Sequence, residues 1–413
     1  MSYPQVRTAL FTGKGGVGKT TLAAAAAVRY SCDGFRTLII STDLAHSLGD
    51  VLGMRLGAEP QQIPEIASGS LYATEVDTQR RFEDAWAGIR DYLVSVLAAG
   101  GLSEVAAEEL VALPGAAEII ALLEVEKHAR SGDFDVIVVD CAPTGETLAL
   151  LALPETLAFY SERLFSAPQR LLRSLAAGFA GRGNARNLTS GEQVRDALGE
   201  VLRRLAEARL VLTQPRSGVV LVSTAERVVI AESRRALTAL SLQGFRVSSV
   251  VLNRLVPAAA DGEWAARMLQ IQESRVEEAG QSFSHLAMFR ADLRAHEPVG
   301  VPALVELAAS TFAGVDPLGE STEVAPTHEF EVAGVGGVYT LTVNVPLADR
   351  GAIGLLRSGD DIVVSVGSHK RRIALPSLLQ RCKTTRATVN QGQLTIEFVP
   401  DPDRWPAALK ASL

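Results

Sequence analysis

A cluster of glycines, two lysines and a threonine near the N-terminus has the residue types and the spacing needed to bind a phosphate chain. The cluster, Gly13-Lys14-Gly15-Gly16-Val17-Gly18-Lys19-Thr20, follows a short apolar segment and precedes an alanine-rich segment that starts near Thr21. Glycines let backbone N–H groups converge on phosphate oxygens, and the N-terminus of a following helix adds positive potential. Lys19 would pair with the β- and γ-phosphates, and Thr20 would give its hydroxyl oxygen to Mg²⁺. The sequence therefore predicts a site for ATP and Mg²⁺ over residues 13–21.

Two carboxylates follow other apolar segments. Asp140 ends the segment that starts at Phe134, and Asp43 comes directly after Thr37-Leu-Ile-Ile-Ser-Thr. Ligands of open α/β sheets bind at the carboxyl ends of the strands, so both side chains are candidates for the same site. Asp140 has the Walker-B arrangement and would hold Mg²⁺ through water. Asp43 would either orient and deprotonate the attacking water or cap the next helix, and the sequence leaves both readings open.

The elements that must position these residues alternate between short apolar segments and longer helical patterns. Five segments are predicted as strands, at residues 6–12, 37–41, 134–140, 219–223 and 247–253. Their nearly continuous apolar composition is typical of parallel strands that are buried on both faces. Helical patterns between strands favour βαβ units. The predicted fold class is α/β, a doubly wound and mostly parallel P-loop sheet with a helical insertion.

Two helical stretches, residues 71–130 and 154–210, are longer than a simple crossover requires. The second carries apolar side chains that fall mostly on one helical face. These are Leu164, Phe165, Leu171, Leu172, Leu175 and Phe179. Such a stripe either packs in a core or binds an apolar client, and composition does not decide between the two.

The pattern changes after residue 313. Residues 314–328 lack periodicity, which predicts a linker. Residues 401–413 are predicted to form a tail. Between them, residues 329–400 show five or more short alternating segments separated by turn residues such as Gly359-Asp360 and Asn390-Gln-Gly392. Strands of period two joined by tight turns predict a small antiparallel β-sandwich.

Composition limits the classes of function. The 413 residues carry a net charge of −7, and 47% are hydrophobic, so a globular fold is expected and a nucleic-acid partner is not. Cys32, Cys141 and Cys382 form no CxxC pair, which predicts no zinc site and suits a reducing compartment. No apolar run reaches the roughly 20 residues of a membrane-spanning helix, and the N-terminus has no leader pattern, so a soluble, cytoplasmic protein is expected.

Three segments together resemble the ArsA family, which includes arsenical pump-driving ATPases and the ATPases of tail-anchored protein targeting. They are residues 14–21, Thr42-Asp-Leu-Ala-His-Ser-Leu-Gly-Asp50, and Asp140-Cys-Ala-Pro-Thr-Gly-Glu-Thr-Leu. The resemblance covers residues 1–313 as one P-loop ATPase domain of the deviant Walker-A class. Residues 329–400 resemble an α-crystallin domain of small heat-shock proteins, for example in Tyr339-Thr-Leu-Thr-Val-Asn-Val-Pro.

This resemblance implies roles for particular residues. Asp43 matches the catalytic carboxylate, and Lys14 matches a lysine that reaches phosphate across a homodimer. Asn253 matches an adenine contact, and Glu226 matches a glutamate near the nucleotide at the dimer interface. Residues 154–210 occupy the place where relatives hold a hydrophobic client helix. The departures are Leu44 in place of proline, Glu146 where many relatives have histidine, and the missing CxxC pair.

The expected function is that of a homodimeric Mg²⁺-dependent ATPase whose nucleotide state controls the binding of an apolar client. A metalloid-efflux motor is one alternative, although the cysteines do not match an arsenite triad. The other alternative is a holdase chaperone led by the β-sandwich.

Overall fold

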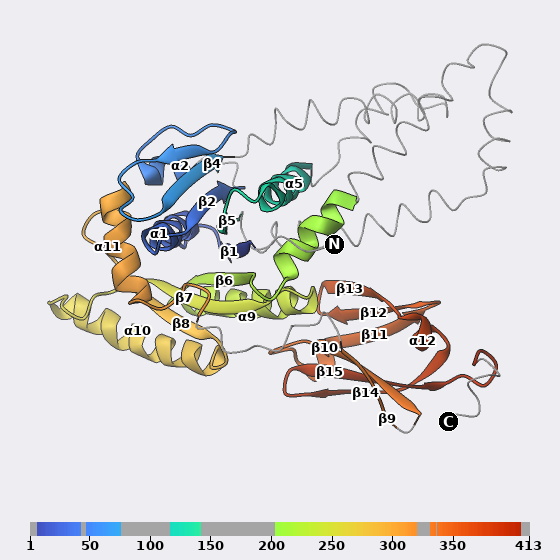
Figure 1. The fold of residues 1–413 in the computed structure, drawn as a ribbon. Coiled ribbons are helices and arrows are strands. Elements are labelled where there is room, and N and C mark those ends of the chain that lie inside the picture. The colour runs from blue at the N-terminus through green and yellow to red at the C-terminus, as the bar shows by residue number, and fades with distance from the viewer. Residues whose placement is uncertain are drawn as a thin grey trace, which may run out of the picture.

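The computed structural model describes residues 6–42, 47–75, 116–141, 203–319, 331–335 and 337–405. They form an N-terminal unit, made of the described residues between 6 and 319, and a C-terminal β-sandwich over the described residues from 331 to 405 (Figure 1). Among the described residues, no helix is long and apolar enough to cross a membrane. Asp43, residues 142–150 and the whole apolar stripe lie outside the described residues.

An eight-stranded sheet forms the centre of the N-terminal unit, in the order β3-β4-β2-β5-β1-β6-β7-β8. Its neighbouring strands run parallel, except that β3 is antiparallel to β4. The strands are β1 (Arg7–Gly13), β2 (Arg36–Ser41), β3 (Gln61–Ile63), β4 (Ser70–Glu75), β5 (Val136–Asp140), β6 (Gly218–Thr224), β7 (Val247–Leu255) and β8 (Ala287–Asp292). The predicted α/β class and mostly parallel sheet are confirmed.

Helices cover both faces of this sheet. One face packs against α1 (Lys19–Cys32), α2 (Ser47–Leu52) and α11 (Val301–Phe312). The other packs against α5 (Ala116–Ser131), the helical residues 203–213, α9 (Arg227–Leu242) and α10 (Glu263–Ser282). Side chains alternate between the faces, so Val138 joins the core with α1 while Ile137 joins the core with α5. Burial on both sides explains why the strand sequences are continuously apolar.

Two boundaries expected from the sequence are wrong. The stretch from residue 71 begins as strand β4 and not as helix, with Leu71 and Ala73 fully buried beside β2. Residues 314–319 are not a free linker, because Leu318 is buried in the core of the N-terminal unit and Asp316 accepts a hydrogen bond of 2.8 Å from Tyr30 Oη. Contacts with residues distant in sequence determine the structure of both segments, and local composition does not indicate those contacts.

The C-terminal unit is a sandwich of two antiparallel sheets, as predicted. One sheet has the order β14-β15-β10-β9 and the other β11-β12-β13. The strands are β9 (Glu331–Val335), β10 (Val338–Asn344), β11 (Ile353–Ser358), β12 (Asp361–Val366), β13 (His369–Ala374), β14 (Cys382–Asn390) and β15 (Gln393–Pro400), with a 3₁₀ turn at Arg350–Ala352 and a short helix α12 at Ser377–Gln380. Alternate residues such as Leu341, Ile362 and Ile396 fill the space between the sheets.

The sandwich packs against the C-terminal end of α9 in the same chain (Figure 1). Leu242, the last residue of α9, is fully buried within the sandwich core. Arg371 Nη1 of β13 donates to Leu242 O at 2.9 Å, and Gln243 Nε2 donates to Lys370 O at 3.1 Å. Thr238 Oγ1 also donates to a carbonyl of the sandwich, that of Pro346, at 2.6 Å. A buried guanidinium at a helix C-terminus satisfies carbonyls that have no partner within the helix.

Arg209 contributes to the same junction from within the N-terminal unit. Its Nη2 donates to Gln243 O at 2.6 Å, next to the carbonyl that accepts from Arg371. This junction therefore joins three parts of the protein: the end of α9, the helical residues 203–213 and the sandwich.

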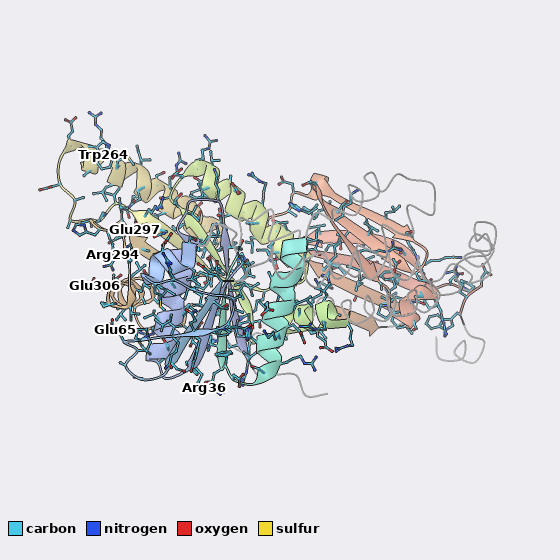
Figure 2. The ribbon with its side chains drawn as sticks, turned by 90° about the horizontal axis from the view of Figure 1, so that it is seen from above. Arg36, Glu65, Trp264, Arg294, Glu297 and Glu306 are labelled. Carbon is cyan, nitrogen blue, oxygen red and sulfur yellow. The ribbon has the colours of Figure 1, made fainter. Side chains whose placement is uncertain are left out.

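Seen from above, the sandwich lies at one end of the molecule (Figure 2). Arg294 and Glu306, which form an ion pair of 3.3 Å, lie at the other end.

Replacing Arg371 with alanine is expected to loosen this junction. Only 2% of Arg371 is exposed, and loss of a buried charged hydrogen bond lowers the free energy of unfolding by about 1.5–3 kcal/mol. Denaturant unfolding measures this loss, and amide hydrogen exchange should accelerate in the last turn of α9. Arg372→Ala is the matched control, because Arg372 pairs with Asp361 inside the sandwich. Unchanged exchange in α9 of Arg371→Ala would show that this arginine does not hold the junction.

Candidate nucleotide site

The glycine-rich loop joins β1 to α1 and opens at the carboxyl edge of the sheet. Gly18 is the N-cap of α1 with φ of 92°, and Gly16 has φ of 80°, conformations that side chains with a Cβ rarely adopt. Among the described residues, a Cβ added at Gly15 or Gly16 would meet nothing within 4 Å, so these residues leave open space beside the loop backbone. This combination of a glycine loop, open space and a helix N-terminus suits an anionic phosphate chain.

Gly13 and Gly18 also allow the loop to pack closely against neighbouring strands. A Cβ at Gly13 would lie 2.1 Å from Val222 O of β6, the strand with which β1 pairs. A Cβ at Gly18 would lie 2.4 Å from Asn253 Nδ2 of β7. Asn253 Nδ2 donates to Val17 O at 2.8 Å, so this amide holds the loop against the sheet. The predicted adenine contact of Asn253 stays a prediction.

The two lysines of the loop have different environments. Lys19 is 7% exposed, and its Nζ donates to Lys14 O at 3.4 Å, so the buried ammonium is held within the loop. Lys14 has 41% of its side chain exposed, with Nζ 3.9 Å from Glu232 Oε2 of α9. The side chain of Lys19 therefore lies within its own loop, whereas the side chain of Lys14 lies at the surface.

Asp140 is completely buried at the end of β5, in register with Ser41 at the end of β2. Its Oδ2 accepts a hydrogen bond of 3.1 Å from Ser41 Oγ, and its backbone carbonyl accepts from Thr42 N at 2.9 Å and Thr42 Oγ1 at 3.1 Å. The chain that leads into Asp43 is thus fixed to the Walker-B strand. Sequence reasoning missed Ser41, although a hydroxyl at the end of the neighbouring strand was a usable signal.

Thr20 lies in the first turn of α1, and its Oγ1 is 3.1 Å from Ser47 Oγ of α2. A hydroxyl and a carboxylate are oxygen ligands of the kind that Mg²⁺ prefers, and Mg²⁺ usually keeps several waters. Thr20 and Asp140 carry oxygens of this kind, and their roles as direct and water-mediated ligands of Mg²⁺ stay predictions. Sequence reasoning missed Ser47, which stands inside the segment 42–50 that was singled out.

Cys141 follows Asp140 directly and is also buried. Burial raises the pKa of its thiol, the Asp140 carboxylate raises it further, and the ammonium of Lys19 lowers it. The thiol is therefore protonated at neutral pH and is no nucleophile. Both the Asp140 carboxylate and the Lys19 ammonium act electrostatically on this one sulfur.

Glu226 precedes α9 as its N-cap, is exposed, and accepts a hydrogen bond of 3.2 Å from Thr224 Oγ1. Its carboxylate stands at the end of β6, next to the strand that leads into the glycine loop. Thr21 is half-buried in the first turn of α1. Both lie near the loop, and their roles in nucleotide binding stay predictions.

The three cysteines lie in separate parts of the fold, at the end of α1, after β5 and in β14, and all are free. Within the described ranges, no group of three or more His, Cys, Asp or Glu side chains could hold a metal ion. These three thiols therefore do not form an arsenite triad within one chain.

A doubly wound parallel sheet with this loop after its first strand defines the class of P-loop ATPases. Within that class, the chain belongs to the ArsA family. The family model described as anion-transporting ATPase matches residues 6–312, and one described as an HSP20-like domain found in ArsA matches residues 336–398.

Similar proteins carry two kinds of name. A putative arsenical pump-driving ATPase of Chlorobaculum tepidum is 34% identical over 395 residues, covering 95% of this chain and 96% of that protein. Putative arsenical pump-driving ATPase 1 of Aquifex aeolicus is 30% identical, covering 95% of this chain and 99% of that protein. ATPase GET3B of Arabidopsis thaliana is 28% identical over 312 residues, covering 71% of this chain and 75% of that protein.

Proposed function

We propose that this ArsA-family ATPase works as a Mg²⁺-dependent homodimer in which ATP binding and hydrolysis control the binding of a hydrophobic client. The observation that carries the proposal is the contrast between the two loop lysines. Lys19 is buried within its own loop, while Lys14 has 41% of its side chain exposed beside α9. An exposed lysine at the edge of a nucleotide site is available to a second copy of the site, as an arginine finger supplied in trans would be.

Within one site, each residue has a role that its position supports. The loop backbone and Lys19 would bind the phosphate oxygens, and Thr20 and Asp140 would hold Mg²⁺, which supplies charge neutralisation at those oxygens when bound. Ser41 fixes the Asp140 carboxylate by its 3.1 Å hydrogen bond. Asp43 follows Thr42, whose backbone and hydroxyl are bonded to Asp140 O, and we assign it the orientation and deprotonation of the attacking water.

The client side of the proposal rests on the apolar residues between 164 and 179 and on the relationship to ATPase GET3B. The helical residues 203–213 follow that segment and are fixed by Arg209 to the end of α9. Because α9 begins at Arg227, directly after Glu226 beside the nucleotide loop, one helix spans from the site to this junction. A shift of α9 with nucleotide state would therefore reach the helical residues 203–213, which follow the apolar residues in sequence.

The two alternatives have less support. The names of several relatives favour a metalloid motor, but the three cysteines do not group within one chain. A holdase led by the sandwich would need that domain to act by itself, whereas here it is bonded to α9 through Arg371 and Gln243.

The test is capture of an apolar helical peptide by Asp43→Asn protein, which should bind ATP and hydrolyse it slowly. We expect the protein to capture the peptide with ATP and to release it with ADP. Capture with ATP should fall in a variant in which Leu171, Leu172, Leu175 and Phe179 are replaced by serine. Asp133→Asn, a change at an exposed carboxylate, is the matched control and should hydrolyse ATP like the wild type. Absence of capture in both nucleotide states, with hydrolysis stimulated by arsenite, would favour the metalloid motor instead.

A further inference from the structure

Two hydroxyl groups from different elements meet beside the glycine loop. Thr20 Oγ1 of α1 lies 3.1 Å from Ser47 Oγ, and Ser47 is the first residue of α2. Both side chains are half-buried, so the contact is partly shielded from water. Nothing in the assigned roles of the ATPase residues uses Ser47.

The position of Ser47 is fixed by contacts that do not involve Thr20. Gly49 N of α2 donates to Glu75 Oε1 at the end of β4 at 2.8 Å, and Gly300 N donates to Val51 O at 2.9 Å. Leu48 is fully buried in the core on that face. Helix α2 is therefore anchored to β4 and to the start of α11, and it presents the Ser47 hydroxyl to Thr20 from a rigid support.

The chemistry of a hydroxyl ligand gives this contact a function. A hydroxyl has one proton to donate and two lone pairs. When Thr20 directs a lone pair to a cation, its proton must point elsewhere and needs an acceptor. Ser47 Oγ lies at hydrogen-bonding distance and is suited to be that acceptor.

We propose that Ser47 is a positioning residue for Mg²⁺, which accepts the Thr20 hydroxyl proton and so directs a Thr20 lone pair toward the cation. This inference rests on the proposed role of Thr20 as a Mg²⁺ ligand. Partners that orient a ligand commonly change metal affinity by about 10–100-fold when they are lost. Ser47 also stands four positions after Asp43, so the same bond ties the end of that segment to the cation site.

The experiment measures binding of a fluorescent ATP analogue to the full chain, first in EDTA and then during a Mg²⁺ titration. In Ser47→Ala, we expect nucleotide affinity in EDTA within about twofold of wild type and a half-saturating Mg²⁺ concentration at least about tenfold higher. Ser47→Cys, which keeps the volume but is a weak acceptor, should behave alike and serves if the alanine variant does not fold. Ser47→Thr should restore the wild-type titration.

Ser249→Ala is the matched control. Ser249 lies near the start of β7, and its buried hydroxyl donates a hydrogen bond of 2.7 Å to Pro317 O, which the substitution removes. It should leave the Mg²⁺ titration unchanged. Ser47 variants with a wild-type titration, or with affinity lowered equally in EDTA and in Mg²⁺, would overturn the inference and leave Ser47 a structural residue. A wild-type protein that binds the nucleotide without any response to Mg²⁺ would instead overturn the proposed cation site itself.

Discussion

Gly13→Ala should destabilise the sheet at the edge where the glycine loop begins. Gly15→Ala, two residues further along the same loop, should fold normally and lose affinity for ATP. A methyl group at Gly13 would stand 2.1 Å from Val222 O, a backbone atom of the paired strand that cannot move without breaking the ladder. We expect the free energy of unfolding to fall by about 3 kcal/mol or more. Denaturant unfolding followed by circular dichroism measures it.

Gly15 offers the opposite case. A Cβ there would meet none of the residues that the structure describes within 4 Å, and the backbone is not left-handed, so stability should change by less than about 0.5 kcal/mol. A side chain in the open space of the loop keeps phosphate oxygens from the backbone N–H groups, so ATP affinity should fall at least about tenfold. Wild-type ATP affinity in Gly15→Ala would show that phosphate does not occupy this loop, and wild-type stability in Gly13→Ala would refute the close β1–β6 approach.

Lys14→Ala and Asp43→Asn, each inactive alone, should regain ATP hydrolysis when mixed. A charge supplied in trans is worth about 10³-fold or more in phosphoryl transfer, so Lys14→Ala is expected to lose hydrolysis to that extent. In a mixed dimer, the site on the Lys14→Ala protomer keeps its own Asp43 and receives Lys14 from its partner. Half of randomly formed dimers are mixed and one of their two sites is complete, so roughly a quarter of wild-type activity should return.

Steady-state hydrolysis by the separate and combined variants measures this recovery. Lys127→Ala is the matched control, because Lys127 is a lysine of α5 with 44% of its side chain exposed and it pairs with Glu124 as Lys14 pairs with Glu232. It should retain full activity. Mixtures that stay inactive, although the two variants form dimers, would place Lys14 in its own site and remove the main support for a shared nucleotide site.

The sequence predicted the parts of this protein that local physics controls. Strand β1, the glycine loop and α1 follow one another within a few residues, and the loop needs glycines wherever φ is positive. Asp140 was placed at a strand end because four apolar residues precede it. The sandwich was predicted from alternation and turn residues, which are also local signals.

The tertiary structure decided what depends on residues far apart in the chain. Several features join segments that no local sequence pattern relates. They are the pairing of β4 with β2, the burial of Leu318, the Ser41–Asp140 hydrogen bond and the Thr20–Ser47 contact. The packing of the sandwich against α9 also depends on residues far apart in the chain. The local sequence around Arg371 predicts only a strand, and the hydrogen bond from its guanidinium to Leu242 O is seen only in the tertiary structure. Residue types and spacing therefore determined the chemistry available to this chain. Only packing decided which groups meet, because the free energy of a buried contact depends on partners that the neighbouring sequence does not specify.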